Sequence, residues 1–152
     1  MTRLLCRLSL VLLPITAAVH ADEPAASTAE QQALATLDEF MEAFNSADAG
    51  RWAETLNYPH VRVAAGTVRI WQNADEYADQ FRFDEFRRRT GWHHSEWDEE
   101  RVSQSSKDKA HIAVTFTRYR ADGSKIASYR SLYIVTNQGG HWGVQARSSF
   151  AP

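Results

Sequence analysis

The C-terminal third of the chain contains three segments of strand-type residues separated by two turn signals. The segments are residues 110–120, 125–136 and 141–150, and the turns are Asp122-Gly123 and Gly139-Gly140. Dipeptides of this kind favour tight β-hairpins. Residues 92–102 form a longer and more polar strand pattern upstream. We therefore expect a four-stranded antiparallel meander at the C-terminal end of the domain.

The N-terminal half shows helical spacing of apolar residues before two short strand patterns. The first helix has one apolar face, made of Leu34, Leu37, Met41 and Phe44. A short helix around Trp52 follows, then strands near residues 61–64 and 67–71, then a third helix from its cap at Asn73 to Gly91. This order predicts an α+β fold in which a sheet wraps around about three N-terminal helices.

The hairpin turns also predict which strand residues share a face. A two-residue turn at Asp122-Gly123 pairs Phe116 with Tyr129 and Ile112 with Tyr133. A two- or four-residue turn around Gly139-Gly140 then puts Val144 and Ala146 on the same face as Tyr133. The expected core face holds Ile112, Val114, Phe116, Arg118, Tyr129, Ser131, Tyr133, Val135, Trp142, Val144, Ala146, Ser148 and Phe150. The expected outer face holds His111, Thr115, Thr117, Ser128, Arg130, Gln145, Arg147 and Ser149. One extra residue in a strand would reverse the assignments beyond it.

Residues 1–21 have the pattern of a secretory signal peptide. Arg3 and Arg7 form a positive end, an apolar stretch follows, and Val19-His20-Ala21 is a small-x-small cleavage site. The stretch is shorter than the roughly 20 residues that span a bilayer, so we expect no membrane attachment after cleavage. Residues 22–28 are then a disordered leader and residues 29–152 one domain. The predicted location is outside the cytoplasm, in the periplasm.

Charge and cysteine content narrow the possible partners. Loss of Arg3 and Arg7 would take the formal net charge from −2 to −4, which argues against nucleic acid because that partner needs a basic surface. Cys6, the one cysteine of the sequence, lies in the predicted signal peptide, so no disulfide is expected in the mature domain. The aromatic residues must supply much of the buried area.

Several short motifs carry a resemblance to a known superfamily. They are Phe40-Met41-Glu42-Ala43-Phe44-Asn45 with Asp48, Tyr58-Pro59-His60-Val61, Gly66, and Trp142-Gly143-Val144. Together with the element order, they make nearly all of the mature chain similar to the nuclear transport factor 2-like superfamily, which includes ketosteroid isomerase and the SnoaL-like polyketide cyclases. The resemblance implies a cone-shaped, strongly bent antiparallel sheet that encloses an apolar cavity. It also implies a homodimer formed through the outer sheet face.

The expected cavity combines the core face with residues of the short helix and strands. The candidate ligand-binding residues are Trp52, Tyr58, His60, Trp71, Arg118, Tyr129, Ser131, Tyr133 and Ser148. Arg118 is an arginine on an otherwise apolar face, and a buried arginine needs an anion. That anion is either a carboxylate of the third helix, Asp84 or Glu85, or a carboxylate or enolate of a ligand. Arg62 and Arg147 are weaker candidates of the same kind.

No motif in the sequence specifies a reaction. The expected core face holds no carboxylate, which departs from ketosteroid isomerase chemistry. Candidate catalytic residues for a dehydratase-like reaction are His60, Tyr129 and Tyr133, since a neutral histidine is a usable general base. His94, Glu96 and Asp98 alternate along one strand, but their spacing matches no established metal site, so no metal and no cofactor are expected.

Three hypotheses remain open from the sequence. The first is a secreted binding domain for a small apolar or carboxylate-bearing ligand, held in an aromatic-lined pocket without catalysis. The second is a cofactor-independent lyase, isomerase or hydrolase that uses a His/Tyr pair. The third is an interaction protein whose polar outer face pairs two chains; a homodimer fits all three.

Overall fold

The computed structural model describes residues 28–152, which form four helices and six strands. The helices are α1 (Thr28–Asn45), α2 (Ala49–Glu54), α3 (Ala74–Gln80) and α4 (Phe83–Thr90). The strands are β1 (Leu56–Ala64), β2 (Thr67–Trp71), β3 (His94–Ser106), β4 (Lys109–Tyr119), β5 (Lys125–Gln138) and β6 (His141–Ser149). The predicted signal peptide and residues 22–27 of the predicted leader lie outside this range. Within residues 28–152, no helix has the length and apolar character needed to cross a membrane.

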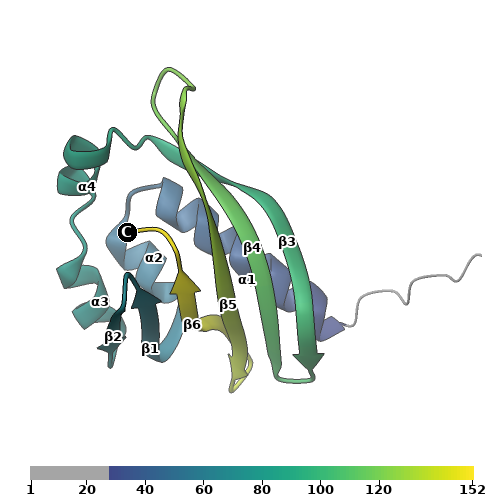
Figure 1. Cartoon of the computed structure of the whole chain (residues 1–152). Helices are drawn as coiled ribbons and strands as arrows, with labels where there is room; N and C mark the ends of the chain where they lie inside the picture. Colours follow the sequence, from purple (N-terminus) through teal and green to yellow (C-terminus); the bar gives the residue numbers. More distant parts are fainter. Residues whose placement is uncertain (1–27) are drawn as a thin grey trace, which may run out of the picture.

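The six strands form one curled sheet in the order β2-β1-β6-β5-β4-β3. Neighbouring strands are antiparallel except β1 and β6, which run parallel. Helix α1 lies across the concave face of the sheet, α2 and α3 lie beside the short strands β1 and β2, and α4 lies above α3 (Figure 1). The α+β fold with a bent sheet around N-terminal helices is therefore confirmed, as is the C-terminal meander of β3 to β6.

The predicted third helix is in fact two helices. Asn73 caps α3 by accepting a hydrogen bond from the backbone N–H of Glu76, and Gly91 ends α4 in the left-handed conformation, as expected. Between the two helices, Phe81 and Arg82 have extended backbone angles. Residues two apart point away from each other on a continuous helix, and the break lets Phe81 and Phe83 both pack inward with ring centroids 4.6 Å apart.

The predicted register is correct for one hairpin and wrong for part of the other. Phe116 pairs with Tyr129 and Ile112 with Tyr133, as predicted, but the register shifts by one residue between Arg118 and Tyr119, so the turn is not the predicted two-residue one. In the second hairpin Val135 pairs with Val144, but Ile134 then pairs with Ala146, so Gln145 is an extra residue. This bulge reverses the faces beyond it: Arg147 and Ser149 turn inward, and Ala146 and Ser148 turn outward. Phe150, also expected inside, is 80% exposed.

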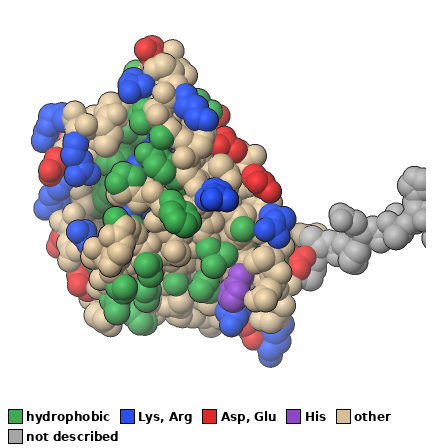
Figure 2. All heavy atoms as spheres, viewed as in Figure 1, with side chains coloured by type: hydrophobic (Ala, Val, Ile, Leu, Met, Phe, Trp, Pro, Cys, Tyr) green, Lys and Arg blue, Asp and Glu red, His purple; other side chains and the backbone are tan. Residues whose placement is uncertain are grey.

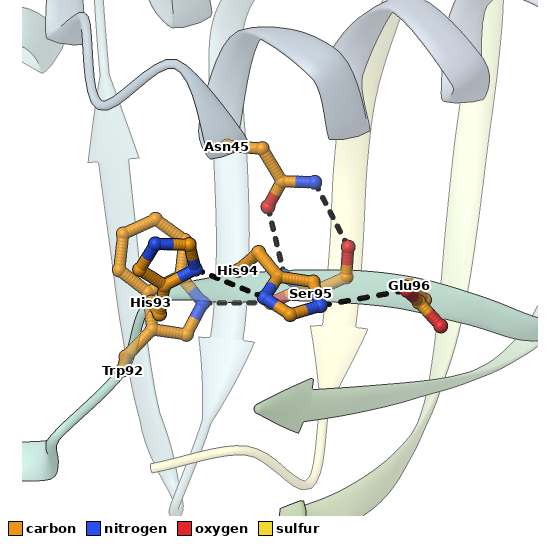
Figure 3. A network of polar contacts seen from close by, with 6 residues as sticks. All are labelled: Asn45, Trp92, His93, His94, Ser95 and Glu96. Carbon is orange, nitrogen blue, oxygen red and sulfur yellow. Dashed lines mark hydrogen bonds and ion pairs between the residues drawn. The ribbon is translucent and has the colours of Figure 1, made fainter. Parts of the chain in front are cut away.

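Two polar contacts of Asn45 join the end of α1 to the start of β3. Its side-chain amide donates to the carbonyl oxygen of Ser95 at 2.8 Å, and its side-chain oxygen accepts from the Ser95 backbone N–H at 2.8 Å (Figure 3). Trp92 donates its indole N–H to the Ser95 hydroxyl at 2.9 Å. These bonds hold the long helix at a fixed position along the outermost long strand, which sets the depth of the space beneath α1.

Candidate functional site

A cavity of about 500 Å³ lies between the helices and the concave face of the sheet. Much of its wall is aromatic: Phe40, Phe44, Trp52, Trp71, Tyr77, Phe81, Phe86, Trp97, Phe116 and Tyr133. These rings come from α1, α2, α3, α4 and four strands, and they pack on one another edge-on or tilted with centroids mostly 4.8 to 6 Å apart. A volume of this size and an aromatic lining are typical of a small-molecule site.

The charged residues of the wall are almost all positive. Among the described residues that line the cavity, six are arginines and one is an acid; they are Arg62, Arg69, Arg82, Arg89, Arg118, Arg147 and Glu85. The whole sequence, in contrast, has a formal net charge of −2. Positive charge is therefore concentrated at this one hollow of an acidic protein.

Three of the arginines form a row across neighbouring strands. Arg69 on β2 pairs with Arg62 on β1, and Arg62 pairs with Arg147 on β6. Neighbouring strands lie about 4.8 Å apart, and like charges at directly opposite positions destabilise a sheet. The central arginine, Arg62, donates from its Nη2 to the carbonyl oxygens of Ala151 at 3.3 Å and Pro152 at 3.4 Å, which offsets part of this repulsion.

Arg147 lies in an aromatic niche at the inner end of this row. Its guanidinium carbon is 5.1 Å from the Trp52 ring centroid and 5.4 Å from that of Phe40, and its Nη2 donates to the Tyr77 hydroxyl at 2.9 Å. Among residues 28–152, nothing accepts a hydrogen bond from its buried Nε, and no carboxylate is within ion-pair distance. Arg147 thus has donors to offer to a ligand.

Arg118 lies in a second aromatic niche. Its side chain is 8% exposed, and its guanidinium carbon is 4.9 Å from the Phe86 ring centroid, 5.0 Å from Tyr129 and 5.6 Å from Phe116. Of the described carboxylates, none is within 4.0 Å, so neither Asp84 nor Glu85 is the predicted ion-pair partner. The Arg118 Nε is also buried without an acceptor in the described part of the chain.

Burial and the neighbouring charges shift the pKa values of Arg62, Arg118 and Arg147. Burial, and then the charge of Arg147, lowers the pKa of Arg62 to about 10. Burial also lowers the pKa of Arg118. Burial opposes the charge of Arg147, yet the phenol oxygens of Tyr77 and Tyr133 hold its pKa above the ordinary value. All three side chains stay charged at neutral pH, because a guanidinium does not lose its proton there.

The structure brings four of the residues expected in the cavity onto its wall and leaves five elsewhere. Trp52, Trp71, Arg118 and Tyr133 line the cavity, whereas Tyr58, His60, Tyr129, Ser131 and Ser148 do not. Tyr129 packs behind Arg118, and the Ser131 hydroxyl donates to that of Ser149, which does line the cavity. Ser148 is exposed on the outer face, so its expected place on the core face is wrong, because of the bulge at Gln145.

His60 is fully buried beside the cavity and is not part of its wall. Its Nδ1–H donates to the Val144 carbonyl oxygen at 2.9 Å, and its ring packs against Trp71 and Tyr77. Burial, and then the charge of Arg147, lowers the pKa of His60 to about 3, so the imidazole is neutral at pH 7. The geometry accounts for His60 as a packing residue that links β1 to β6; its catalytic role stays a prediction.

Arg147 and Arg62 line the cavity, although the sequence indicates them only as weaker candidates than Arg118. The sequence predicts Arg147 on the outer face, because nothing in residues 141–149 marks Gln145 as a bulge, and this prediction is wrong. Arg62 alternates with Val61 and the exposed Val63 along β1, and its pairing with Arg147 depends on the parallel contact between β1 and β6. This contact joins segments about 85 residues apart in the sequence. Local sequence patterns cannot predict a pairing between segments so far apart.

The histidine pair at the start of β3, His93 and His94, lies at the surface. His94 lies 3.4 Å from the Glu96 carboxylate and stacks on Tyr119, and the Nδ1 atoms of His93 and His94 are 3.1 Å apart (Figure 3). Asp98 instead accepts a hydrogen bond from Thr117 at 2.6 Å. In the described part of the chain, no group of three or more His, Cys, Asp or Glu side chains could hold a metal ion.

Comparison with known proteins agrees with the fold described above. The sequence matches the family described as "NTF2-like protein (DUF6841)" over residues 29–149. No curated protein matches the sequence.

Solved structures share the fold at low sequence identity. A cystatin-like-fold protein of unknown function from Nostoc punctiforme has a TM-score of 0.66 at 12% identity, over 82% of this chain and 92% of its own. An NTF2-like protein of unknown function from Shewanella oneidensis has a TM-score of 0.59 at 13% identity, over 79% and 97%. A ketosteroid isomerase-like protein from Erwinia carotovora atroseptica has a TM-score of 0.56 at 23% identity, over 78% and 94%. These likenesses establish the fold and leave the ligand open.

Proposed function

Because the chain belongs to the NTF2-like family (DUF6841), we propose that its cavity binds a small organic anion, such as a carboxylate with an apolar or aromatic body. The observation that carries this proposal is that two arginines of the cavity wall, Arg118 and Arg147, have no Asp or Glu partner and keep a buried Nε without an acceptor among residues 28–152. A buried charge without a counterion is costly, and guanidinium groups bind carboxylates through paired, charge-assisted hydrogen bonds. The aromatic wall supplies the apolar contact area.

The cavity rim favours the arrival of an anion. Arg69, Arg82 and Arg89 are exposed side chains that line the cavity, and Glu85 is the acid among the described lining residues. Positive charge around a hollow raises the local concentration of anions and speeds their association. The proposal also places the protein outside the cytoplasm, on the strength of the signal-peptide pattern in residues 1–21, so the ligand would come from the periplasm or the surroundings.

Calorimetric titration with benzoate and with its neutral analogue benzamide tests the proposal. We expect benzoate to bind at least about tenfold more tightly than benzamide, since a charge-assisted pair is stronger than a neutral contact. Arg147→Gln should remove most of that preference. Arg88→Gln is the matched control, because Arg88 is exposed on α4 and is not part of the cavity wall.

Two results would contradict the proposal. One is equal affinity of the acid and the amide; the other is an unchanged acid preference in Arg147→Gln. Native mass spectrometry of protein purified from its natural compartment adds an independent measurement, because a bound acid would appear as a mass increment released on denaturation.

A further inference from the structure

The two innermost arginines lie in separate aromatic niches. The Arg147 guanidinium contacts the rings of Phe40 and Trp52, whereas the Arg118 guanidinium contacts Phe86, Phe116 and Tyr129. The two sets share no ring. Both arginines nevertheless line the same cavity, and the charge of Arg147 contributes to the lowered pKa of Arg118.

The backbone register separates the two positions further. Arg147 lies in the transverse row that contains Tyr133 on β5 and Ile112 on β4, and Arg118 is six residues along β4 from Ile112. Six residues of strand span about 20 Å before bending. An even spacing also keeps Arg118 and Ile112 on one face, so the curl of the sheet turns both arginines toward the same interior.

Aromatic rings occupy the wall between the niches. One path runs from Phe40 to Tyr133 to Trp97 to Phe116, with successive centroids 5.5, 5.7 and 6.1 Å apart. A second path runs from Trp52 through Phe44 to Phe86, at 4.8 and 6.1 Å. At least one ring therefore separates the rings around Arg147 from those around Arg118, and that stretch of wall offers apolar contact.

From this arrangement we propose that the cavity takes a dianion: an elongated apolar or aromatic molecule with one acidic group at Arg147 and Arg62 and a second at Arg118. This rests on the proposed anion-binding function and specifies its ligand class. A single carboxylate reaches one niche and leaves the charge of the other buried and uncompensated. Both niches retain an Nε–H for which the described residues provide no acceptor, so each end has a donor free for a ligand oxygen.

A series of aromatic acids tests the two-ended ligand. Benzene-1,4-, naphthalene-2,6- and biphenyl-4,4′-dicarboxylate increase the separation of the two acidic groups, and each is compared by calorimetry with its own monocarboxylate. We expect at least one diacid to bind about tenfold or more tightly than its monoacid, because it gains a second buried charge pair. Low and moderate salt should give similar ratios, since buried pairs are weakly screened.

Variants assign each end of the best diacid. Arg118→Gln should bring its affinity to within about threefold of the matching monoacid, and Arg147→Gln should weaken diacid and monoacid alike. Arg88→Gln is the control for loss of one charge on the same protein. Circular dichroism verifies that each variant is folded, and Arg118→Lys, which keeps the charge but not the Nε–H, should show an intermediate loss for the diacid.

The outcomes separate this inference from the function on which it rests. If monoacids bind and no diacid binds more tightly, the cavity is an anion site with one acidic end and the dianion inference is overturned. The same conclusion follows if Arg118→Gln weakens diacid and monoacid equally. If neither class binds to folded protein, the anion-binding function itself fails.

Discussion

At the scale of single residues, the cavity wall combines charges and rings that would not be placed together for stability alone. Arg62 and Arg118 have no Asp or Glu partner in the described chain, and burial together with the charge of Arg147 lowers the pKa of both, so each lowers the stability of the ligand-free fold. Cation–π contacts offset part of that cost. Because these charges destabilise the ligand-free protein, we expect an anion that binds them to raise the free energy of unfolding.

Glu100 provides a prediction at the same scale, independent of the cavity. It pairs with Val114 on the core side of β3, one of its carboxylate oxygens is buried without a partner in the described part, and burial, with the charge of Asp38, raises its pKa from 4.5 to about 7. Between pH 4.5 and 7 the folded state keeps a proton that the unfolded state releases, so this group lowers stability as pH rises through that window.

Replacement of Glu100 by Gln should therefore stabilise the protein more at pH 8 than at pH 4.5. We expect a gain of about 1 kcal/mol, kept small because the side chain is partly exposed and screened by solvent. Urea unfolding at several pH values measures the effect, with Glu99→Gln as the control for loss of one carboxylate at an exposed neighbouring position. A gain that is the same at pH 4.5 and pH 8 would show that Glu100 does not titrate in this window.

At the scale of elements, the site depends on how α1 and β6 are positioned against the sheet. The bulge at Gln145 turns Arg147 into the cavity, and β6 holds its place between β5 and the parallel strand β1. The ideal Cβ of an alanine at Gly143 would lie 2.9 Å from Asn57 and Leu56 atoms, so a glycine is needed where β6 crosses the start of β1. On the other side of the cavity, Asn45 fixes α1 to β3.

The two Asn45 bonds make a prediction at the scale of elements. Asn45→Ala removes both the donor to the Ser95 carbonyl oxygen and the acceptor from the Ser95 N–H, and leaves partly buried backbone groups unpaired. The expected loss is about 1–3 kcal/mol in the free energy of unfolding. Asn45→Asp keeps the acceptor for the Ser95 N–H but turns a second carboxylate oxygen toward the Ser95 carbonyl oxygen, so it should also lose stability. Denaturant unfolding tests both variants. An alanine variant as stable as the wild type would mean that the two Asn45–Ser95 hydrogen bonds make no net contribution to the free energy of unfolding.

At the scale of the whole molecule, the outer face of the sheet carries exposed apolar side chains. Val61, Ala146 and Ile134 lie in one transverse row with Ile70, and Val63 and Leu132 lie in the next row with Val68. Val63, Val68, Ile70, Leu132 and Phe150 are exposed large hydrophobics. Figure 2 shows hydrophobic side chains gathered over the short strands and β5 on this face. An exposed apolar patch of this kind is characteristic of a protein interface.

We propose that this face pairs two copies of the chain, as the predicted homodimer requires. Light scattering after size exclusion should give the mass of a dimer for the wild type and of a monomer for Leu132→Asp, since a charge buried in an apolar interface is left unpaired. Gln104→Asp, at an exposed position of β3 away from the apolar rows, is the control and should stay dimeric. A wild-type monomer at working concentration would exclude the dimer.

The sequence by itself determined the features that depend on nearby residues. The order of the elements, the caps at Asn73 and Gly91, and the Phe116–Tyr129 register follow from periodicity, capping and the position of a hairpin turn, all of which act over a few residues. Arg118 was found for the same reason, because its place in β4 follows from the adjacent hairpin.

Only the tertiary structure decided the features that depend on distant contacts. The bulge at Gln145 arises where β6 pairs with both β5 and the distant β1, and the break at Phe81 and Arg82 lets two rings enter one aromatic cluster. The arginine row of Arg69, Arg62 and Arg147 exists only once β2, β1 and β6 are side by side. Long-range packing chose between local conformations of similar energy, and that choice placed three positive charges in the cavity.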